Sequence, residues 1–188
     1  LGTEALDEGT MERYIREYSL WQMKGFFEKP VVKEAFWEEL GALAKDGKGQ
    51  YHVTAAGLLM FGKKEQIIKK FPRFLLKYEE YGREAEEEIR YEPSKPDFAE
   101  AETTEVMPGG WNGNLFDFFL SVCANILEDT RFASEAAMQE KSRKEAQENL
   151  VAGIREALAN ALSHANYYDR NGVLVRKEKE QILIANPG

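Results

Sequence analysis

The sequence predicts an α+β fold in two parts, a small helical unit over residues 1–71 and a region of helices and strands over residues 72–188. Three observations support this prediction. Apolar residues recur at helical spacing in several stretches of both parts, whereas short runs of β-branched and aromatic residues, typical of strands, follow Pro72 and close the chain. Hydrophobic residues make up 43% and aromatic residues 12% of the chain, as in globular proteins that pack a core.

Composition and charge narrow the functional classes. With 188 residues the chain can hold one sizeable core or two small ones. The net charge of −8 argues against broad, nonspecific binding of nucleic acid, although a local basic patch is compatible with it. No apolar run is long enough to span a membrane and the first residues lack a signal-peptide pattern, so we expect a cytoplasmic protein without a membrane partner. The single cysteine, Cys123, excludes an internal disulfide and fits a reducing compartment.

The N-terminal elements follow from apolar spacing and turn residues. The spacing predicts three helices, over 10–19, 31–44 and 55–61, and Thr10 and Thr54 are the expected caps of the first and the third. A turn over 46–49 and a short strand over 50–53 separate the second helix from the third, which ends at Gly62. This order is compatible with half of a winged-helix module. For His52, in the short strand, we favour a structural role because no carboxylate or cysteine partner lies close in sequence.

A basic cluster follows the third predicted helix and consists of Lys63, Lys64, Lys69 and Lys70. One interpretation is weak contact with the phosphates of DNA. The other is a solvated surface near the end of a helix, which the acidic character of the whole chain favours.

The second part opens with a predicted strand over 73–81. Residues 82–105 are strongly acidic, and prolines interrupt residues 82–110. Acidic residues can bind metal, but no ligand spacing is recognisable, so we favour a flexible arm or a solvated excursion over 82–110, with 103–107 as a candidate strand that pairs with the first. Asn112 or Asn114 is the expected cap of the helix that follows.

The capped helix has a wide apolar stripe, so we predict that it is a main core helix and that Cys123 is buried in it as a small hydrophobic residue. Residues 135–148 are polar and are predicted to form a loop or an exposed helical lead-in. Two short strands, over 173–176 and 181–185 with a turn between them, close the chain.

Residues 155–167, which are predicted to form the second half of a long helix, include the residues of most functional interest. Glu156, Asn160 and His164 are four residues apart, so they stack along one face of the helix. The apolar residues form another face, which consists of Leu150, Val151, Ile154, Ala157, Leu158, Ala161 and Leu162. The plain interpretation is an amphipathic helix whose polar face meets water. The alternative is a site in which the Asn160 oxygen binds magnesium and Glu156 orients or deprotonates a water, while His164 holds a phosphate or Glu156, or caps the helix.

Residues 155–164, with the sequence REALANALSH, resemble the N-box helix of the GHKL-type ATPases. More narrowly they resemble the RecG-helicase-related bacterial transcriptional regulators, also called AlbA/Schlafen-type regulators, in which a tyrosine, two strands and the sequence N-P-G follow this helix. This chain has Tyr167, two predicted strands and Asn186-Pro187-Gly188 in the same order. Residues 54–62 also resemble the linker segment of those regulators, and GNLF at 113–116 resembles the start of the helix that leads to the N-box.

The resemblance implies that residues 72–188 form the start of a GHKL-like α/β sandwich, with helices on one face of a sheet. It implies ATP and magnesium as cofactors of the full-length protein, with Glu156 positioning water, Asn160 holding magnesium, and His164, Asn186 and Gly188 close to the nucleotide. It further implies a bacterial regulator that acts on DNA, with possible ATPase activity and possible homo-oligomers.

The chain departs from the family in two places. It has Ala165-Asn166 where the family often has Arg-Asp, so a basic residue that could face phosphate is missing. In the family a glycine-containing nucleotide loop, a lid and further strands follow N-P-G, so we expect this chain to be an internal piece that holds part of a site and is inactive by itself. The alternative function is a non-enzymatic regulatory, oligomerisation or DNA-binding module with a degenerate nucleotide site.

Overall fold

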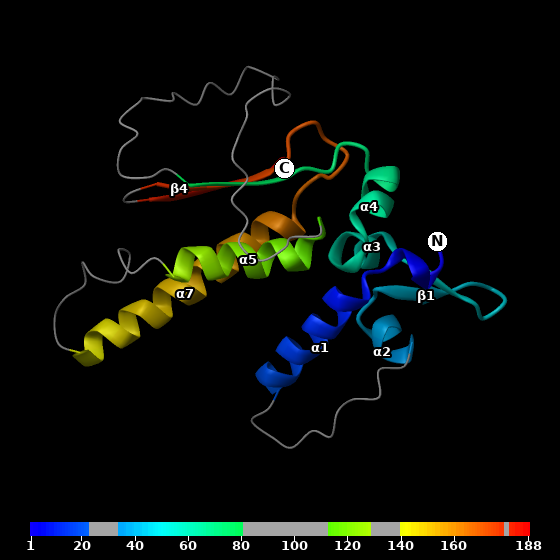
Figure 1. Cartoon of the computed structure of the whole chain (residues 1–188), viewed down its shortest axis with the longest axis horizontal. Helices are drawn as coiled ribbons and strands as arrows, with labels where there is room; N and C mark the ends of the chain where they lie inside the picture. Colours follow the sequence, from blue (N-terminus) through cyan, green and yellow to red (C-terminus); the bar gives the residue numbers. More distant parts are fainter. Residues whose placement is uncertain (23–33, 81–112, 129–139, 179–180) are drawn as a thin grey trace. The chain divides into compact units, whose positions relative to one another are not determined.

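Helices and short strands follow one another along the chain in an α+β fold, as the sequence predicted (Figure 1). The computed structural model describes residues 1–22, 34–80, 113–128, 140–178 and 181–188. In chain order the elements are η1 (Thr3–Ala5), α1 (Glu8–Gln22), α2 (Glu34–Glu39), β1 (Leu43–Lys45), β2 (Tyr51–Val53), α3 (Ala55–Phe61), α4 (Lys64–Lys70), β3 (Leu76–Glu80), α5 (Leu115–Glu128), α7 (Glu140–Ser163), β4 (Val173–Lys177) and β5 (Ile182–Ala185).

The chain divides into two compact units. The first comprises Leu1–Phe74, Gly109–Ser121 and Tyr167–Arg170, and the second comprises Leu75–Pro108, Val122–Asn166 and Asn171–Gly188. Each unit is built from segments that are far apart in sequence, and α5 contributes its first half to the first unit and its second half to the second.

In the first unit, α1 begins two residues earlier than the sequence predicted. Asp7 precedes the helix, and its Oδ1 accepts a hydrogen bond of 2.8 Å from the backbone N–H of Thr10. A carboxylate in this position satisfies a free N–H of the first turn, so Asp7 takes the role that was predicted for Thr10. The prediction for Thr10 was wrong: this residue lies inside the helix with only 1% of its surface exposed.

The second predicted helix is shorter in the structure, because part of it forms a strand. Helix α2 ends at Glu39, and Gly41 then takes a φ of +73°, in the left-handed region that commonly terminates helices. Leu43 pairs with Val53 in the antiparallel hairpin of β1 and β2. Leu43 is buried in the hairpin, whereas Leu40, which follows α2, is exposed.

The hairpin turn is organised by Asp46, which also provides a carboxylate partner for His52 that was not expected from the sequence. Asp46 Oδ1 accepts hydrogen bonds from the backbone N–H groups of Lys48 and Gln50, while its Oδ2 lies 3.0 Å from His52 Nε2. The hydrogen bond from His52, followed by those from Gln50 and Lys48, lowers the pKa of Asp46 below its ordinary value. His52 therefore has a carboxylate partner six residues away, and its role in the hairpin is structural.

Helix α3 forms as the sequence predicted. The Thr54 side chain accepts a hydrogen bond of 2.9 Å from the Gly57 N–H, and Gly62 closes the helix. Phe61, at the end of α3, packs in a group of aromatic rings. The Tyr14 ring lies edge-on to the Phe61 ring, with 5.1 Å between the two ring centroids. The core around them also contains Leu6, Trp37, Ala42, Leu43 and Phe116.

The second unit contains a three-stranded mixed sheet in the order β3-β4-β5. Strand β4 pairs in parallel with β3 and antiparallel with β5, and the strands lie side by side in Figure 1. Val173 and Val175 of this central strand are each at most 1% exposed. Helix α7 packs on the sheet through contacts with β5. The predicted strands over 173–176 and 181–185 are confirmed, and the strand predicted over 73–81 is confirmed in its C-terminal part.

Oppositely charged residues face each other across β3 and β4. Glu79 Oε2 accepts a hydrogen bond of 3.0 Å from Arg176 Nε, and its Oε1 lies 2.8 Å from Lys77 Nζ. Burial alone would raise the pKa of Glu79, but the hydrogen bonds and charges of Lys77 and Arg176 outweigh it and hold that pKa below its ordinary value. One position further along, the buried Lys177 Nζ donates to Glu80 Oε1 at 2.9 Å.

Two predictions lie outside the described residues, the flexible arm over 82–110 and the candidate strand over 103–107. Residues 135–148 were predicted to form a loop or an exposed helical lead-in; those from Glu140 onward form the first turns of α7, and 135–139 lie outside the described residues. Within the described ranges, the structure contains no helix with the length and apolar composition needed to span a membrane.

Replacing Gly57 by alanine tests the close approach of α3 to the hairpin. A Cβ added at Gly57 would lie 2.1 Å from the backbone oxygen of Ala42, so the backbone must shift, and we expect a loss of about 1–3 kcal/mol in the free energy of unfolding. The matched control is Gly153→Ala in α7, where a Cβ meets nothing within 4 Å. That change should stabilise the chain by up to about 1 kcal/mol. Urea denaturation followed by circular dichroism measures the free energy of unfolding of both variants. An equal change in the two variants would contradict the tight contact at Gly57.

The Glu79 ion pairs predict a pH dependence of stability. Because the folded state lowers the pKa of Glu79, its contribution is complete above the unfolded pKa of about 4.3 and is lost as the pH falls through the lower folded value. At neutral pH, Glu79→Gln should cost about 1–2 kcal/mol. The difference from wild type should shrink below a pH of about 4. Exposed Glu148→Gln, also in the second unit, is the control and should change little at any pH.

Candidate functional site

The helix that carries the predicted site residues is α7, and its apolar face is the one that the sequence indicated. Ile154, Leu158, Ala161 and Leu162 are buried, whereas Ala157, which was assigned to the same face, is exposed. This face packs in the second unit, so the opposite face of the helix is available to solvent.

Glu156, Asn160 and His164 are all exposed on that opposite face. Glu156 and Asn160 lie one helical turn apart near the C-terminal end of α7. His164 directly follows the last helical residue, and its backbone N–H donates a hydrogen bond of 3.1 Å to the Asn160 carbonyl oxygen. The structure therefore places the three residues along one exposed edge that ends where the helix ends.

The C-terminal segment of the chain meets the same end of α7. Asn186 Nδ2 donates a hydrogen bond of 3.2 Å to the carbonyl oxygen of Ala161, and the Asn166 N–H donates one of 2.8 Å to the carbonyl oxygen of Pro187. Ala161 is the neighbour of Asn160 in sequence, so Asn186 and Pro187 lie beside the residues of the predicted site. The amide of Asn186 is at the same time a cap for a carbonyl group that the helix leaves without a partner.

The electrostatics of a helix end favour a cation there. Aligned peptide dipoles give the C-terminal end of a helix a partial negative charge, and α7 is 24 residues long. The neutral Asn160 oxygen is a hard ligand of the kind that magnesium prefers, and the Glu156 carboxylate one turn earlier adds negative charge. Among the side chains that the structure describes, no three His, Cys, Asp or Glu residues gather closely enough to hold a metal ion.

The predicted basic cluster is divided between the two ends of α4. Lys63 precedes the helix and its Nζ donates a hydrogen bond to the Glu4 carbonyl oxygen, while the side-chain carbons of Lys64 pack against Gly113. Lys69 and Lys70 are exposed in the last turn, about 9 Å along the axis. Among these four lysines, only the side chains of Lys69 and Lys70 have no contact in the described structure that would draw them away from solvent.

Sequence reasoning missed a second group of residues that the structure places next to Lys69 and Lys70. Tyr168 is 62% exposed, its ring packs on Phe71, and Arg73 donates a hydrogen bond to its carbonyl oxygen. The signal was present as a tandem Tyr167-Tyr168 in a polar stretch, but only the fold shows that this stretch packs against residues 71–74.

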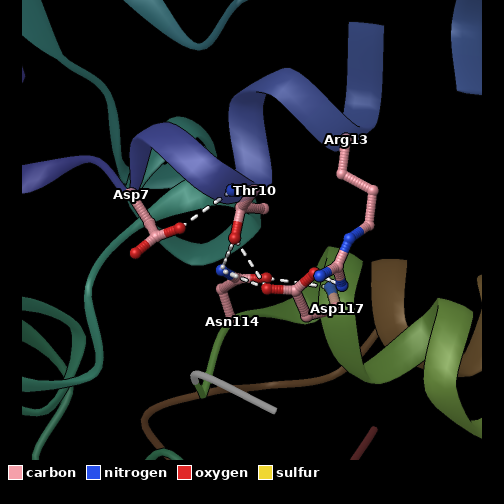
Figure 2. Close-up of polar contacts among 5 residues, drawn as sticks. All are labelled: Asp7, Thr10, Arg13, Asn114 and Asp117. Carbon is pink, nitrogen blue, oxygen red and sulfur yellow. Dashed lines mark hydrogen bonds and ion pairs between the residues drawn. The ribbon is translucent and has the colours of Figure 1, made fainter. Parts of the chain in front are cut away.

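A buried polar cluster joins α1 to the start of α5, as Figure 2 shows. Of the two predicted caps, Asn112 and Asn114, it is Asn114 that caps α5, because its Oδ1 accepts a hydrogen bond of 2.9 Å from the Asp117 N–H. The Thr10 hydroxyl accepts a hydrogen bond of 3.0 Å from Asn114 Nδ2 and donates one of 2.6 Å to Asp117 Oδ2. Arg13 completes the cluster with an ion pair to Asp117 Oδ1.

A hydroxyl that donates to a buried carboxylate is also a pattern found in active sites. Here Thr10 and Asn114 are at most 1% exposed and Asp117 is 2% exposed, so a substrate cannot reach the hydroxyl. The role of the cluster is structural. A capping Asn with an acidic residue three positions later, inside an otherwise apolar stripe, is the sequence signal that could have found it.

Comparison with known proteins finds a family that matches the N-terminal part of the chain. Residues 1–77 match a family described as a domain of unknown function (DUF8451). No curated protein and no solved structure matches the chain. The matched region extends from the N-terminus into β3 and therefore includes α3 and α4, whereas α5 and α7 lie outside it.

Asp117→Asn tests the buried cluster. The substitution keeps the size of the side chain but removes the charge that faces Arg13, and it should cost about 2–3 kcal/mol in the free energy of unfolding. Exposed Glu12→Gln on α1 is the control and should change stability by less than about 0.5 kcal/mol.

A double-mutant cycle with Arg13→Met isolates the ion pair from the other contacts of Asp117. We expect a coupling energy of about 1 kcal/mol or more between the two positions. Additive effects of the two substitutions would show that the arginine contributes nothing through Asp117.

Proposed function

We propose that the second unit is part of a nucleotide-binding domain of the GHKL type, in a RecG-related bacterial regulator, and that it binds magnesium-ATP at the C-terminal end of α7. The observation that supports the proposal most is the meeting of two distant parts of the resembled motif. The Asn186 side chain is hydrogen-bonded to α7 at Ala161, next to Asn160. A binding site that uses both Asn160 and Asn186 requires the two segments to lie close together. Asn186 and Ala161 are 25 positions apart in sequence, so their contact does not follow from chain connectivity.

The chemistry of the helix end is consistent with magnesium in particular. Asn160 offers an exposed neutral oxygen, and the partial negative charge of the helix end favours a cation over a bare phosphate. When bound, the ion would neutralise part of the charge on the phosphates. We therefore assign Asn160 to the metal, and Glu156, one turn earlier, to a water whose proton its carboxylate can accept.

The remaining assignments follow the positions of the residues. His164 ends the exposed edge and can donate a hydrogen bond to a phosphate, and Gly188 follows the docked Asn186-Pro187 segment. For the fold, a mixed sheet with α7 packed on it supports a GHKL-like α/β sandwich. In the first unit, the short helices α3 and α4 and the β1–β2 hairpin support a winged-helix-like arrangement.

The test is calorimetric titration of ATP, with and without magnesium, into the full natural polypeptide and two variants of it. Asn160→Ala should reduce magnesium-dependent affinity at least about tenfold because it removes a metal ligand. The variant should keep its fold, and its free energy of unfolding should equal that of wild type or exceed it by up to about 0.5 kcal/mol, because Ala is the better helix former. Asn149→Ala is the matched control, since Asn149 is also exposed on α7.

Three outcomes would contradict the assignment. Equal nucleotide affinity of both variants and wild type would place the site elsewhere. A wild-type protein that does not bind magnesium-ATP would favour the alternative of a regulatory or oligomerisation module with a degenerate nucleotide site. If Asn160→Ala unfolds the domain while the folded fraction still binds nucleotide, Asn160 is a structural residue.

A further inference from the structure

The surface formed by the end of α4 and the segment that packs on it combines positive charge with an exposed aromatic ring. We define this α4 surface by Lys69, Lys70, Arg73, Tyr168 and Arg170, all of which are exposed. All five belong to the first unit and are independent of the residues proposed to bind nucleotide.

Charge is concentrated here against the trend of the whole chain. The α4 surface has four basic residues, Lys69, Lys70, Arg73 and Arg170, in a chain whose net charge is −8. Two acidic residues, Glu65 on α4 and Asp169 beside Tyr168, are also exposed or half-buried in this region and reduce the local excess. The excess remains positive, so an anionic partner is favoured.

The geometry around Phe71 holds the parts of the surface together. Phe71 follows α4 directly and is 2% exposed, so it anchors the chain at the point where Lys69 and Lys70 end the helix. The Tyr168 ring lies 5.1 Å from the Phe71 ring at an angle of 54°, and Arg73 donates a hydrogen bond of 3.4 Å to the Tyr168 carbonyl oxygen.

The exposure of Tyr168 identifies the kind of anion. At 62% it is the most exposed of the large apolar side chains in the described part of the chain, while its neighbour Tyr167 packs into the core next to Phe74. A fixed ring beside positive charges offers a stacking surface for a base together with contacts for the flanking phosphates. Bases of a duplex are already stacked on each other, so only an unpaired base can use the ring.

We propose that the α4 surface binds single-stranded nucleic acid, with the phosphates on Lys69, Lys70 and Arg73 and a base stacked on Tyr168. This differs from the backbone contact with DNA that the lysine cluster alone suggested, because charge alone does not distinguish single strands from duplexes. Lys63 and Lys64 lie at the other end of α4, about 9 Å along the helix axis from Lys69 and Lys70, and are not part of it.

The experiment measures fluorescence anisotropy of labelled oligothymidylate and oligouridylate of about 15 nucleotides and of a duplex of equal length. Titrations at several salt concentrations between about 50 and 200 mM give the salt slope. We expect weak binding that is tighter for both single strands than for the duplex. A difference in affinity between oligothymidylate and oligouridylate would show whether the surface prefers DNA or RNA.

Two kinds of variant separate stacking from charge. Tyr168→Leu keeps an apolar contact for Phe71 and should weaken single-strand binding about 5- to 150-fold without changing the salt slope, because the ring carries no charge. Tyr168→Phe should bind as wild type. Alanine at Lys69, Lys70 or Arg73 should each lower the salt slope by about 0.7. Lys48→Ala, at an exposed lysine in the hairpin turn, is the control and should change neither quantity.

Several results would overturn the proposal. Binding of the duplex as tight as or tighter than that of the single strands would assign the surface to double-stranded DNA. Wild-type affinity in Tyr168→Leu would exclude stacking. The absence of any salt-dependent binding at the lowest salt concentration would exclude nucleic acid as the partner of this surface. Circular dichroism of each variant confirms that the fold is retained.

Discussion

The buried carboxylate of Asp117 is the constraint on which the first unit depends. Its two oxygens bind Thr10 and Arg13 of α1, which are 107 and 104 residues away in sequence. A buried polar group is tolerated only when its hydrogen bonds are complete, so the cluster has one arrangement and fixes α1 against the start of α5. Because Tyr14 of α1 packs on Phe61 and Phe116, the same constraint positions the end of α3 and, through Gly62, the start of α4.

The second unit is organised by the pairing of two strands, β3 and β4, that are far apart in sequence. Strands β3 and β4 pair in parallel, and parallel strands need a long connection between them. Helices α5 and α7 both lie in that connection, so the helix with the predicted site residues is part of the crossover itself. Charged pairs such as Glu79 with Arg176 fix the register, because a shift of one residue would move each side chain to the other face.

The two proposed functional surfaces use opposite electrostatics. The end of α7 has an exposed carboxylate, a neutral amide oxygen and the negative end of the helix dipole, which together favour a metal cation. The α4 surface has lysines and arginine around an aromatic ring, which favour phosphates and a base. Each surface can be altered by substitutions at exposed residues that leave the core of its unit unchanged. The two proposed functions can therefore be tested separately.

The sequence by itself determined the elements whose signals are local. Thr54 as the cap of α3, Asn114 as the cap of α5, the apolar face of α7 and the closing pair of strands all follow from spacing and short-range hydrogen bonding. Cys123 was also correctly predicted to be buried, and burial raises the pKa of its thiol to about 11. The candidate residues Glu156, Asn160 and His164 could be selected in this way because a single helix places them on one face.

Tertiary structure decided what depended on distant partners. Leu43 has helical spacing but forms a strand because Val53 pairs with it, and Asp7 displaces Thr10 as a cap because Thr10 is taken up by Asp117. The docking of Asn186 on α7 and of Tyr168 on Phe71 likewise joins residues that no local pattern connects. Local propensities are worth about 1 kcal/mol or less per residue, and burial and complete hydrogen bonding in the folded chain outweigh them.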